Sequence, residues 1–440
     1  MPTIKNRRAT RDQWEINNPV LASGEMGYEI DTNKHKIGNG FSTWSELRYF
    51  IDEEASDFLY VPNEIVETGR LSEAALDAKF GNETHVSKFT STAWKNALFR
   101  RQEKTVRLLV LSDSRAEGPT PNASIEGVTD WGKNWPNVLT EQLRSEYRMP
   151  VGGRGFIPVT HTDPDENYRY SVSSFISGAR TPVVGETGVT GSTYMVGNKL
   201  RIPLRPGTSS VDVISHKVPA GDHGLNVTTE SRGVVEQFSH NELPADAMII
   251  DRVLSPGDYI DVEVWYNGWN LLGVVENVDD EDGGFQVMNL ATSGIGSDQV
   301  AVSLTKNAMR ELISWWSPSI SILSLGANDI GRLSATTTVD NLTTISNTLT
   351  TLVPKTMTLV TTVPAALSNP YGAPMPPEEL WDSLNEAIRN SNHRVLDLSS
   401  VIQTSESEIS TGLFLTDLTH LTDSGNVAFS DLVRGQLDLG

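Results

Sequence analysis

The sequence predicts an α/β protein: a doubly wound parallel sheet with a β-rich insertion within it and a small β-rich unit before it. Two observations lead to this prediction. Strand-like apolar runs alternate with helical patterns in residues 104–154 and again in 284–440, which is the pattern of a covered parallel sheet. Residues 155–283, between these stretches, are rich in Gly, Pro, Ser, Thr and Val and contain no convincing helix.

The composition indicates a globular chain of several domains. With 440 residues, 38% of them hydrophobic and 21% charged, we expect about two to four domains at ~150 residues each. The net charge of -21 argues against a nucleic-acid partner, because such binding depends on neutralising phosphates with Lys and Arg. The chain has no cysteine, so disulfides, thiolate catalysis and Cys-based zinc sites are excluded.

The sequence shows no signal for membrane insertion or general secretion. Residues 1–14 are polar and basic and lack the apolar core of a signal peptide. No uninterrupted run of about 20 apolar residues occurs, so we expect no membrane-spanning helix. We therefore expect a protein that is made in the cytoplasm without a signal peptide.

Residues 1–50 predict a small β-rich unit. Met26, Tyr28 and Ile30 alternate before a turn at residues 31–34, and a second turn follows at 38–40. A unit of this size buries little surface alone, so we expect it to need partner chains. Residues 51–103 are expected to form a connector with a short helix at 71–78.

The elements of the sheet follow in order. The first strand is expected at 106–111, where a continuous apolar run suits a strand buried on both faces. The helix expected at 134–147 has Trp135 and Leu139 on one face and Pro136 in its first turn. The other expected strands are 211–215 and 259–266 in the insertion and 285–290, 319–325, 357–363 and 394–398 after it. The other expected helices are 297–316, 340–352, 377–388 and 423–437.

Three polar clusters lie where α/β folds keep their active sites. Residues 112–118 follow the first strand, residues 326–329 follow the strand at 319–325, and residues 417–420 precede the last helix. Each cluster alone is most often only a turn or a helix cap. Because ligands bind outside the carboxyl ends of parallel strands, we expect the three to meet at one edge of the sheet.

These clusters contain the residue types of a serine hydrolase. Ser114 sits at a turn after a buried strand, as a nucleophile requires, and Asp417 lies close enough in sequence to orient His420. The oxyanion needs fixed donors, for which the candidates are the Ser114 N–H, a glycine N–H and the Asn328 amide.

The clusters together resemble the blocks of the GDSL/SGNH hydrolases. Ser112-Asp113-Ser114-x-x-x-Gly118 resembles the first block, Gly326-x-Asn328-Asp329 the Gly-x-Asn-Asp block, and Asp417-x-x-His420 the C-terminal block. The stretch from Asn289 to Gly294 resembles the block that supplies an oxyanion glycine. Ser112 departs from the pattern, because the family usually has Gly there, and it adds a side chain beside the nucleophile.

The resemblance implies a fold and a set of roles. The fold would be a flavodoxin-like three-layer α/β/α SGNH domain over residues 104–154 and 284–440. Ser114 would be the nucleophile, His420 the base and Asp417 its orienter. The oxyanion donors would be Ser114, Gly294 and Asn328, and neither a metal nor a cofactor would be needed. The insertion, 155–283, resembles more loosely the β-sandwich modules found beside such domains.

The N-terminus resembles an attachment module of phage tail and receptor-binding proteins. The matching positions, in order, are Arg7-Arg8-Ala9-Thr10, Gln13-Trp14, Asn18-Pro19-Val20-Leu21, Gly24-Glu25-Met26-Gly27-Tyr28-Glu29, Asp31-Thr32, Lys36-Ile37-Gly38-Asn39-Gly40 and Trp44-x-x-Leu47. In that family the module attaches the protein to the virion, and the proteins are often homotrimers. The resemblance implies a place in the tail or baseplate and contacts with other tail proteins.

Three hypotheses for the function follow. The first is an esterase that hydrolyses acyl esters, such as O-acetyl groups, on host cell-surface glycans or lipids during adsorption. The second is a receptor-binding adhesin, and the third a structural tail protein, each with a vestigial hydrolase domain. Trp265 and Trp269, in the insertion, fit either sugar stacking or ordinary packing. The acidic run 279–284 lacks the spacing of a calcium loop.

Overall fold

The structure, a computed structural model, describes residues 7–47, 92–117, 133–158 and 174–437. Short gaps in these ranges fall at 24, 33–34, 39, 102–103, 150–152, 154, 178–179, 185–189, 195–198, 206, 218–223, 232, 234, 241, 245, 265–268, 279–282, 293, 367–375, 403–411 and 415–419. The chain forms two compact units, Met1–Ile65 and Val66–Gly440. The helix expected at 71–78 lies outside the described residues.

In its described residues, the first unit is a three-stranded sheet with one helix. Its strands are β1 (Arg7–Ala9), β2 (Met26–Glu29) and β3 (His35–Ile37), with β1 and β2 parallel and β2 and β3 antiparallel. The helix α1 (Arg11–Asn17) was not predicted, although its signal is local. Thr10 accepts a hydrogen bond from the Gln13 N–H while the Gln13 side chain accepts one from the Thr10 N–H, a capping box that fixes the start of the helix.

Two tryptophans form the core of this unit. Trp14 of α1 stacks on Trp44 with ring centroids 4.1 Å apart, and Leu21 and Leu47 are buried with them. The Lys36 side chain lies over the Trp44 ring and donates to its carbonyl oxygen. This small aromatic core explains how so short a segment folds.

The second unit contains the predicted parallel sheet. Its order is β16-β4-β17-β18-β19 with every pair parallel, which is the flavodoxin-like order 2-1-3-4-5. The α/β fold is thereby confirmed. The strands are β4 (Val106–Ser112), β16 (Phe285–Asn289), β17 (Ile320–Ser324), β18 (Met357–Thr361) and β19 (Arg394–Leu396).

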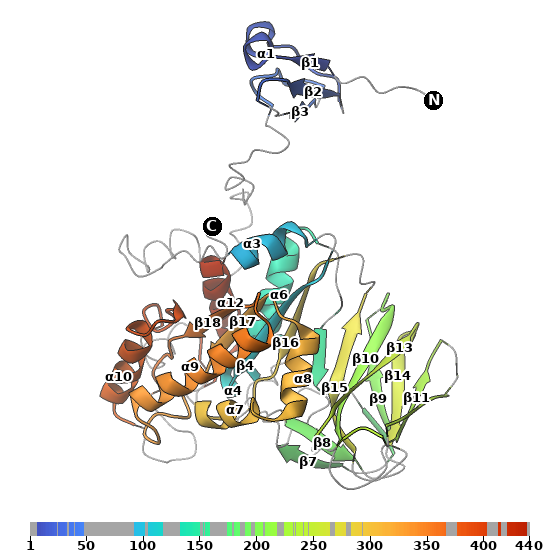
Figure 1. The fold of residues 1–440 in the computed structure, drawn as a ribbon, viewed down its shortest axis with the longest axis vertical. Coiled ribbons are helices and arrows are strands. Elements are labelled where there is room, and N and C mark those ends of the chain that lie inside the picture. The colour runs from blue at the N-terminus through green and yellow to red at the C-terminus, as the bar shows by residue number, and fades with distance from the viewer. Residues whose placement is uncertain are drawn as a thin grey trace. The chain divides into compact units, whose positions relative to one another are not determined.

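Helices cover both faces of this sheet (Figure 1). Leu109 and Leu111 of β4 belong to one apolar core and Leu108 and Val110 to another, since alternate strand residues point to opposite faces. The first core is closed by α7 (Ser297–Ser303), α8 (Asn307–Trp316), α9 (Ala335–Leu352) and α10 (Glu378–Arg389). The second is closed by α3 (Thr92–Phe99), α6 (Trp135–Glu146) and α12 (Asp423–Leu437). Burial on both faces explains the continuous apolar run of β4.

One predicted helix is wrong, because residues 297–316 form two helices instead of one. The chain turns at Thr305, whose hydroxyl donates to the Val302 carbonyl at 2.7 Å. The second helix then starts at Asn307, whose N–H donates to Asp246 of the insertion at 3.1 Å. The helix α3 was not predicted either, and α9 begins five residues earlier than expected because Ser334 caps it.

The insertion consists of two antiparallel sheets in its described residues. One has the order β13-β10-β15-β8-β7, with β5 also pairing β15, and the other has the order β12-β11-β14-β9-β6. The strands are β5 (Gly155–Pro158), β6 (Ser174–Ser177), β7 (Arg180–Val184), β8 (Thr190–Tyr194), β9 (Lys199–Pro203), β10 (Ser210–Lys217), β11 (Gly224–Thr229), β12 (Val235–Ser239), β13 (Met248–Leu254), β14 (Tyr259–Val264) and β15 (Trp269–Asn277). Both sheets contribute to one apolar core, which includes Ile202, Val213 and Val274.

The insertion packs against the α/β layer. Ile214 and Leu272 of its first sheet share a core with α8. Arg144 of α6 is buried and donates to the carbonyl oxygens of Gly153, just before β5, and Phe285, at the start of β16. The Arg144 guanidinium thus joins the chain just before the insertion to the chain just after it. Among the described residues, no helix combines the length and hydropathy that a membrane span needs.

Candidate active site

The turn after β4 presents Ser114. The Asp113 carboxylate accepts a hydrogen bond from the Arg115 N–H at 3.0 Å, and its carbonyl accepts one from the Ala116 N–H at 3.1 Å. These bonds turn the chain from β4 into the short helix α4 (Ser114–Glu117). Ser114 therefore begins a helix at the carboxyl edge of the sheet, with 8% of its surface exposed.

His420 reaches this serine from the far end of the chain. Its Nε2 lies 3.0 Å from Ser114 Oγ, although the two residues are 306 positions apart. His420 is also 8% exposed and precedes α12, beside the bridge between Phe414 and Leu421. A hydroxyl within hydrogen-bond reach of an imidazole is the arrangement that proton transfer from a nucleophile requires. Asp417 lies outside the described residues.

Ser112 points to a neighbouring strand. Its hydroxyl donates to the Ser324 carbonyl of β17 at 2.8 Å, and Thr361 of β18 donates to the Ser324 hydroxyl at 3.1 Å. The residue that departs from the family pattern therefore links β4 to β17.

The loop after β16 carries Gly294. The loop is tied to the serine turn, because the Thr292 N–H donates to the Ser112 carbonyl at 3.0 Å and the Asn289 amide donates to the Ala116 carbonyl at 2.8 Å. Gly294 is exposed and has φ +76°, a left-handed conformation that favours glycine. A Cβ at Gly294 would meet nothing within 4 Å.

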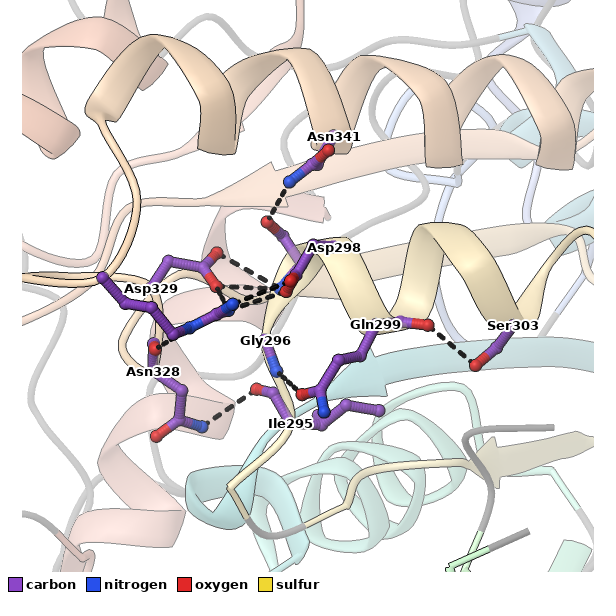
Figure 2. Close-up of polar contacts among 10 residues, drawn as sticks. Ile295, Gly296, Asp298, Gln299, Ser303, Asn328, Asp329 and Asn341 are labelled. Carbon is purple, nitrogen blue, oxygen red and sulfur yellow. Dashed lines mark hydrogen bonds and ion pairs between the residues drawn. The ribbon is translucent and has the colours of Figure 1, made fainter. Parts of the chain in front are cut away.

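Asn328 is joined to the same loop. Its amide nitrogen donates to the Ile295 carbonyl at 2.9 Å, as Figure 2 shows. This bond uses one of the two amide hydrogens. Two of the sequence-predicted oxyanion residues, Gly294 and Asn328, are thus held in adjoining loops.

A network of three charged residues next to Asn328, namely Asp298, Asp329 and Arg332, was not predicted from the sequence. Asp329 is fully buried and accepts hydrogen bonds from the Ser297 N–H at 3.1 Å and from Arg332 at 2.7 Å. Arg332 also forms a two-pronged pair with Asp298, with distances of 2.7 and 2.6 Å. This hydrogen bonding lowers the pKa of Asp298 and raises that of Arg332. The only sequence signal was the spacing of Asp329 and Arg332, which is common on any helical turn.

Asp113 contributes a buried carboxyl group to the site. Burial raises the pKa of Asp113, opposed by the positive charge of Arg115 and by its hydrogen bond from the Arg115 N–H. His420 and Asp329 also interact electrostatically with this group. The residue that shapes the serine turn therefore also contributes to the field around His420.

The remaining candidates can be placed only in part. Trp269 starts β15, where its backbone pairs with Lys217 and Tyr194, but its side chain and the whole of Trp265 lie outside the description. In the part of the chain that the structure describes, no group of three His, Asp or Glu side chains could hold a metal ion.

Comparison with known families identifies the N-terminal segment. Residues 4–42 match the family described as the major tropism determinant N-terminal domain. The chain is also 37% identical over 46 residues to a hyaluronoglucosaminidase of Streptococcus pyogenes phage H4489A. That match spans 10% of this chain and 12% of the phage protein. The predicted phage tail module is thereby confirmed.

Comparison with solved structures concerns the fold of the chain. A peptidoglycan O-acetylesterase superposes with a TM-score of 0.60 and 14% identity, over 80% of this chain and 97% of that one. A lipase/acylhydrolase from Enterococcus faecalis is 20% identical over 35% of this chain and 76% of its own, with a TM-score of 0.27. The first of these similarities shows that the chain has the fold of the O-acetylesterase.

Proposed function

We propose that this chain is a serine esterase carried on a phage tail. The observation that carries the proposal is the 3.0 Å contact between Ser114 Oγ and His420 Nε2, made by two buried residues from opposite ends of the α/β unit. An acyl-ester hydrolase agrees with the fold of that unit and with the phage tail module before it. The serine mechanism rests on the residues themselves.

The proposed reaction follows from the geometry of the pair. His420 takes the proton of Ser114 as its oxygen attacks the ester carbonyl, and the imidazolium then protonates the leaving alcohol. Water, deprotonated by His420, hydrolyses the acyl-enzyme and regenerates the serine. Asp417 holds the imidazole in the tautomer that presents a free Nε2 to the serine.

The negative oxygen of the tetrahedral intermediate needs donors that are already in place. We assign these to the N–H groups of Ser114 and Gly294 and to the Asn328 amide. The bond from Asn328 to the Ile295 carbonyl supports this assignment, because it fixes the amide next to the glycine loop.

The proposed substrate is an acyl ester, such as an O-acetyl group, on a host cell-surface polysaccharide. The similar fold of a protein named a peptidoglycan O-acetylesterase supports this class. Adsorption to the host is the step at which such an ester would be met. Trp265 and Trp269 are candidate sugar contacts in the insertion.

The proposed organisation assigns a role to each part of the chain. Residues 1–50 attach the protein to other tail or baseplate proteins as a homotrimer, and residues 51–103 connect them to the enzyme. Residues 104–154 and 284–440 form the hydrolase domain. Residues 155–283 form an inserted β-sandwich, which the shared core of its two sheets supports.

The proposal is tested with p-nitrophenyl acetate and butyrate. Wild type should release p-nitrophenol, and Ser114→Ala should reduce the rate to background while its circular dichroism and melting temperature stay unchanged. Arg252→Gln, an exposed change in the insertion, is the matched control and should keep wild-type turnover. If folded Ser114→Ala retains turnover, Ser114 has no part in the mechanism. Tight glycan binding by wild type without acyl release from any acetylated glycan would favour the adhesin.

A further inference from the structure

Two loops at the carboxyl edge of the sheet are joined by one guanidinium. The loop after β16 leads through Gly294 and Gly296 into α7, and the loop after β17 carries Asn328. Asp298 in the first turn of α7 and Asp329 after β17, both labelled in Figure 2, are joined by Arg332; we call these three residues the Arg332 clamp. The clamp therefore joins the loop after β17 to the start of α7, directly after the glycine loop.

Arg332 uses all three of its nitrogens in this clamp. Nη1 donates to Asp298 at 2.7 Å, and Nη2 donates to both Asp298 at 2.6 Å and Asp329 at 2.7 Å. Nε donates to the carbonyl oxygen of Asn328 itself at 3.3 Å. The guanidinium therefore fastens the backbone of the proposed oxyanion residue to the first turn of α7.

Two further contacts close the ring. The buried Asp329 accepts from the Ser297 N–H at 3.1 and 3.2 Å, so the Asn328 loop also holds the start of α7 directly. On the other side, the Asn328 amide donates to the Ile295 carbonyl at 2.9 Å. The Asn328 loop is thus attached on both sides of Gly296, at Ile295 and at Ser297.

Gly296 shows how tightly these groups pack. A Cβ there would fall on the Arg332 guanidinium, 2.5 Å from Asp329 Oδ1 and 2.8 Å from Asp298 Oδ1. Its φ of -100° is one that any residue adopts, so the glycine is required by space alone. An added Cβ would therefore clash with all three members of the clamp.

We propose that Arg332 is a positioning residue of the esterase: through Asp298, Asp329 and the Asn328 carbonyl it holds the two oxyanion loops at the separation that the transition state needs. This inference rests on the proposed function and adds a residue to it. Arg332 touches neither substrate nor nucleophile in this role, and its effect passes through Asn328 and the glycine loop.

The physical basis is preorganisation. Donors help a reaction only when they already point at the place where charge develops, and a misplacement of about 1 Å costs on the order of 100-fold in rate. Arg332→Gln removes the charge and the two-pronged geometry, so we expect kcat to fall about 10- to 100-fold. KM should change less than about 3-fold, since an oxyanion contact is made chiefly in the transition state.

The test uses the full chain and a matched control. The side chain of Arg332 is 44% exposed and its partner Asp329 1% exposed, while Arg252 in the insertion is 43% exposed and pairs two-pronged with Asp212, which is 2% exposed. Arg332→Gln, Arg332→Lys and Arg252→Gln are compared with p-nitrophenyl acetate as substrate. The number of active sites is titrated with a fluorophosphonate, and melting temperatures are recorded.

The expected result is a fall of kcat per titrated site in Arg332→Gln, a smaller fall in Arg332→Lys and no change in Arg252→Gln. A purely structural role would lower the melting temperature and the number of active sites but leave kcat per site unchanged, and that result overturns the inference. If Arg332→Gln does not fold, Asp298→Asn gives the second variant, and it should also lower kcat per site. If wild type is active and these variants keep its kcat per site, the inference about Arg332 is wrong but the proposed function stands. If folded wild type shows no turnover, the proposed function is wrong, and the inference about Arg332 is wrong with it.

Discussion

The replacement Gly296→Ala adds one methyl group where the clamp leaves no space for it. The new Cβ would lie 2.5 Å from Asp329 Oδ1, and the two must separate by about 0.9 Å to reach the ordinary contact distance of 3.4 Å. Asp329 is buried and fixed by Ser297 and Arg332. Because the Cβ would also fall on Arg332 Nη2, we expect the Arg332 side chain to be displaced and, with it, the loops that carry Gly294 and Asn328.

A displacement of that size has two expected effects. Overpacking costs about 1–3 kcal/mol of stability, and a 1 Å shift of the oxyanion donors lowers kcat on the order of 100-fold. The assay is kcat with p-nitrophenyl acetate, with urea unfolding measured in parallel. Gly294→Ala is the matched control: its Cβ meets nothing, so we expect only backbone strain of about 1–2 kcal/mol and a smaller loss of kcat. A folded Gly296→Ala with wild-type kcat would refute the reasoning.

Three further predictions concern stability and its pH dependence. Arg144→Leu removes a buried guanidinium from two backbone carbonyls, so the free energy of unfolding of the second unit should fall by about 2–4 kcal/mol in urea; a fall below about 1 kcal/mol would contradict this. Ser112→Gly removes the hydrogen bond to Ser324 and increases the entropy of the unfolded chain, so the free energy of unfolding should fall by about 1–2 kcal/mol. The kcat should stay within about 3-fold of wild type, and a loss of turnover would mean that Ser112 acts in catalysis. The hydrogen bond from Arg332 lowers the pKa of Asp298 below its ordinary 3.8, so this carboxylate stabilises the fold above about pH 4 and loses that effect as the pH falls further. Urea midpoints should therefore separate wild type from Asp298→Asn at pH 6 and approach each other as the pH falls below 3.8, and a difference that stays constant with pH would contradict the pairing.

Much of the fold was predictable because the sheet is buried on both faces. The apolar run of β4 and the βα alternation after Phe285 mark strands that have no solvent side. The break in the helix at 297–316 was not predicted, and one of its contacts, from the Asn307 N–H to Asp246, joins residues 61 positions apart that no local pattern connects. The helix α1 was predictable, since Thr10 and Gln13 have capping-box spacing.

Some residues of the candidate site could be predicted from the sequence and others could not. Ser114 and His420 could be proposed because short motifs follow strands or precede a helix, and the carboxyl edge of a parallel sheet brings such motifs together. The Arg332 clamp could not be predicted, because Asp298 lies 34 residues from Arg332 and no motif in either segment indicates that the two side chains pair. The role of Ser112 was also invisible, because its partner is a backbone carbonyl on another strand.

The most direct measurement of the central claim is covalent labelling of the nucleophile with a fluorophosphonate, followed by mass spectrometry of the peptide that contains Ser114. The short contact to His420 should make this one serine reactive at neutral pH, so wild type should gain a single phosphonyl group on Ser114. His420→Ala should label at least about 100-fold more slowly. Labelling of wild type at another serine, or equal labelling of His420→Ala, would contradict the account.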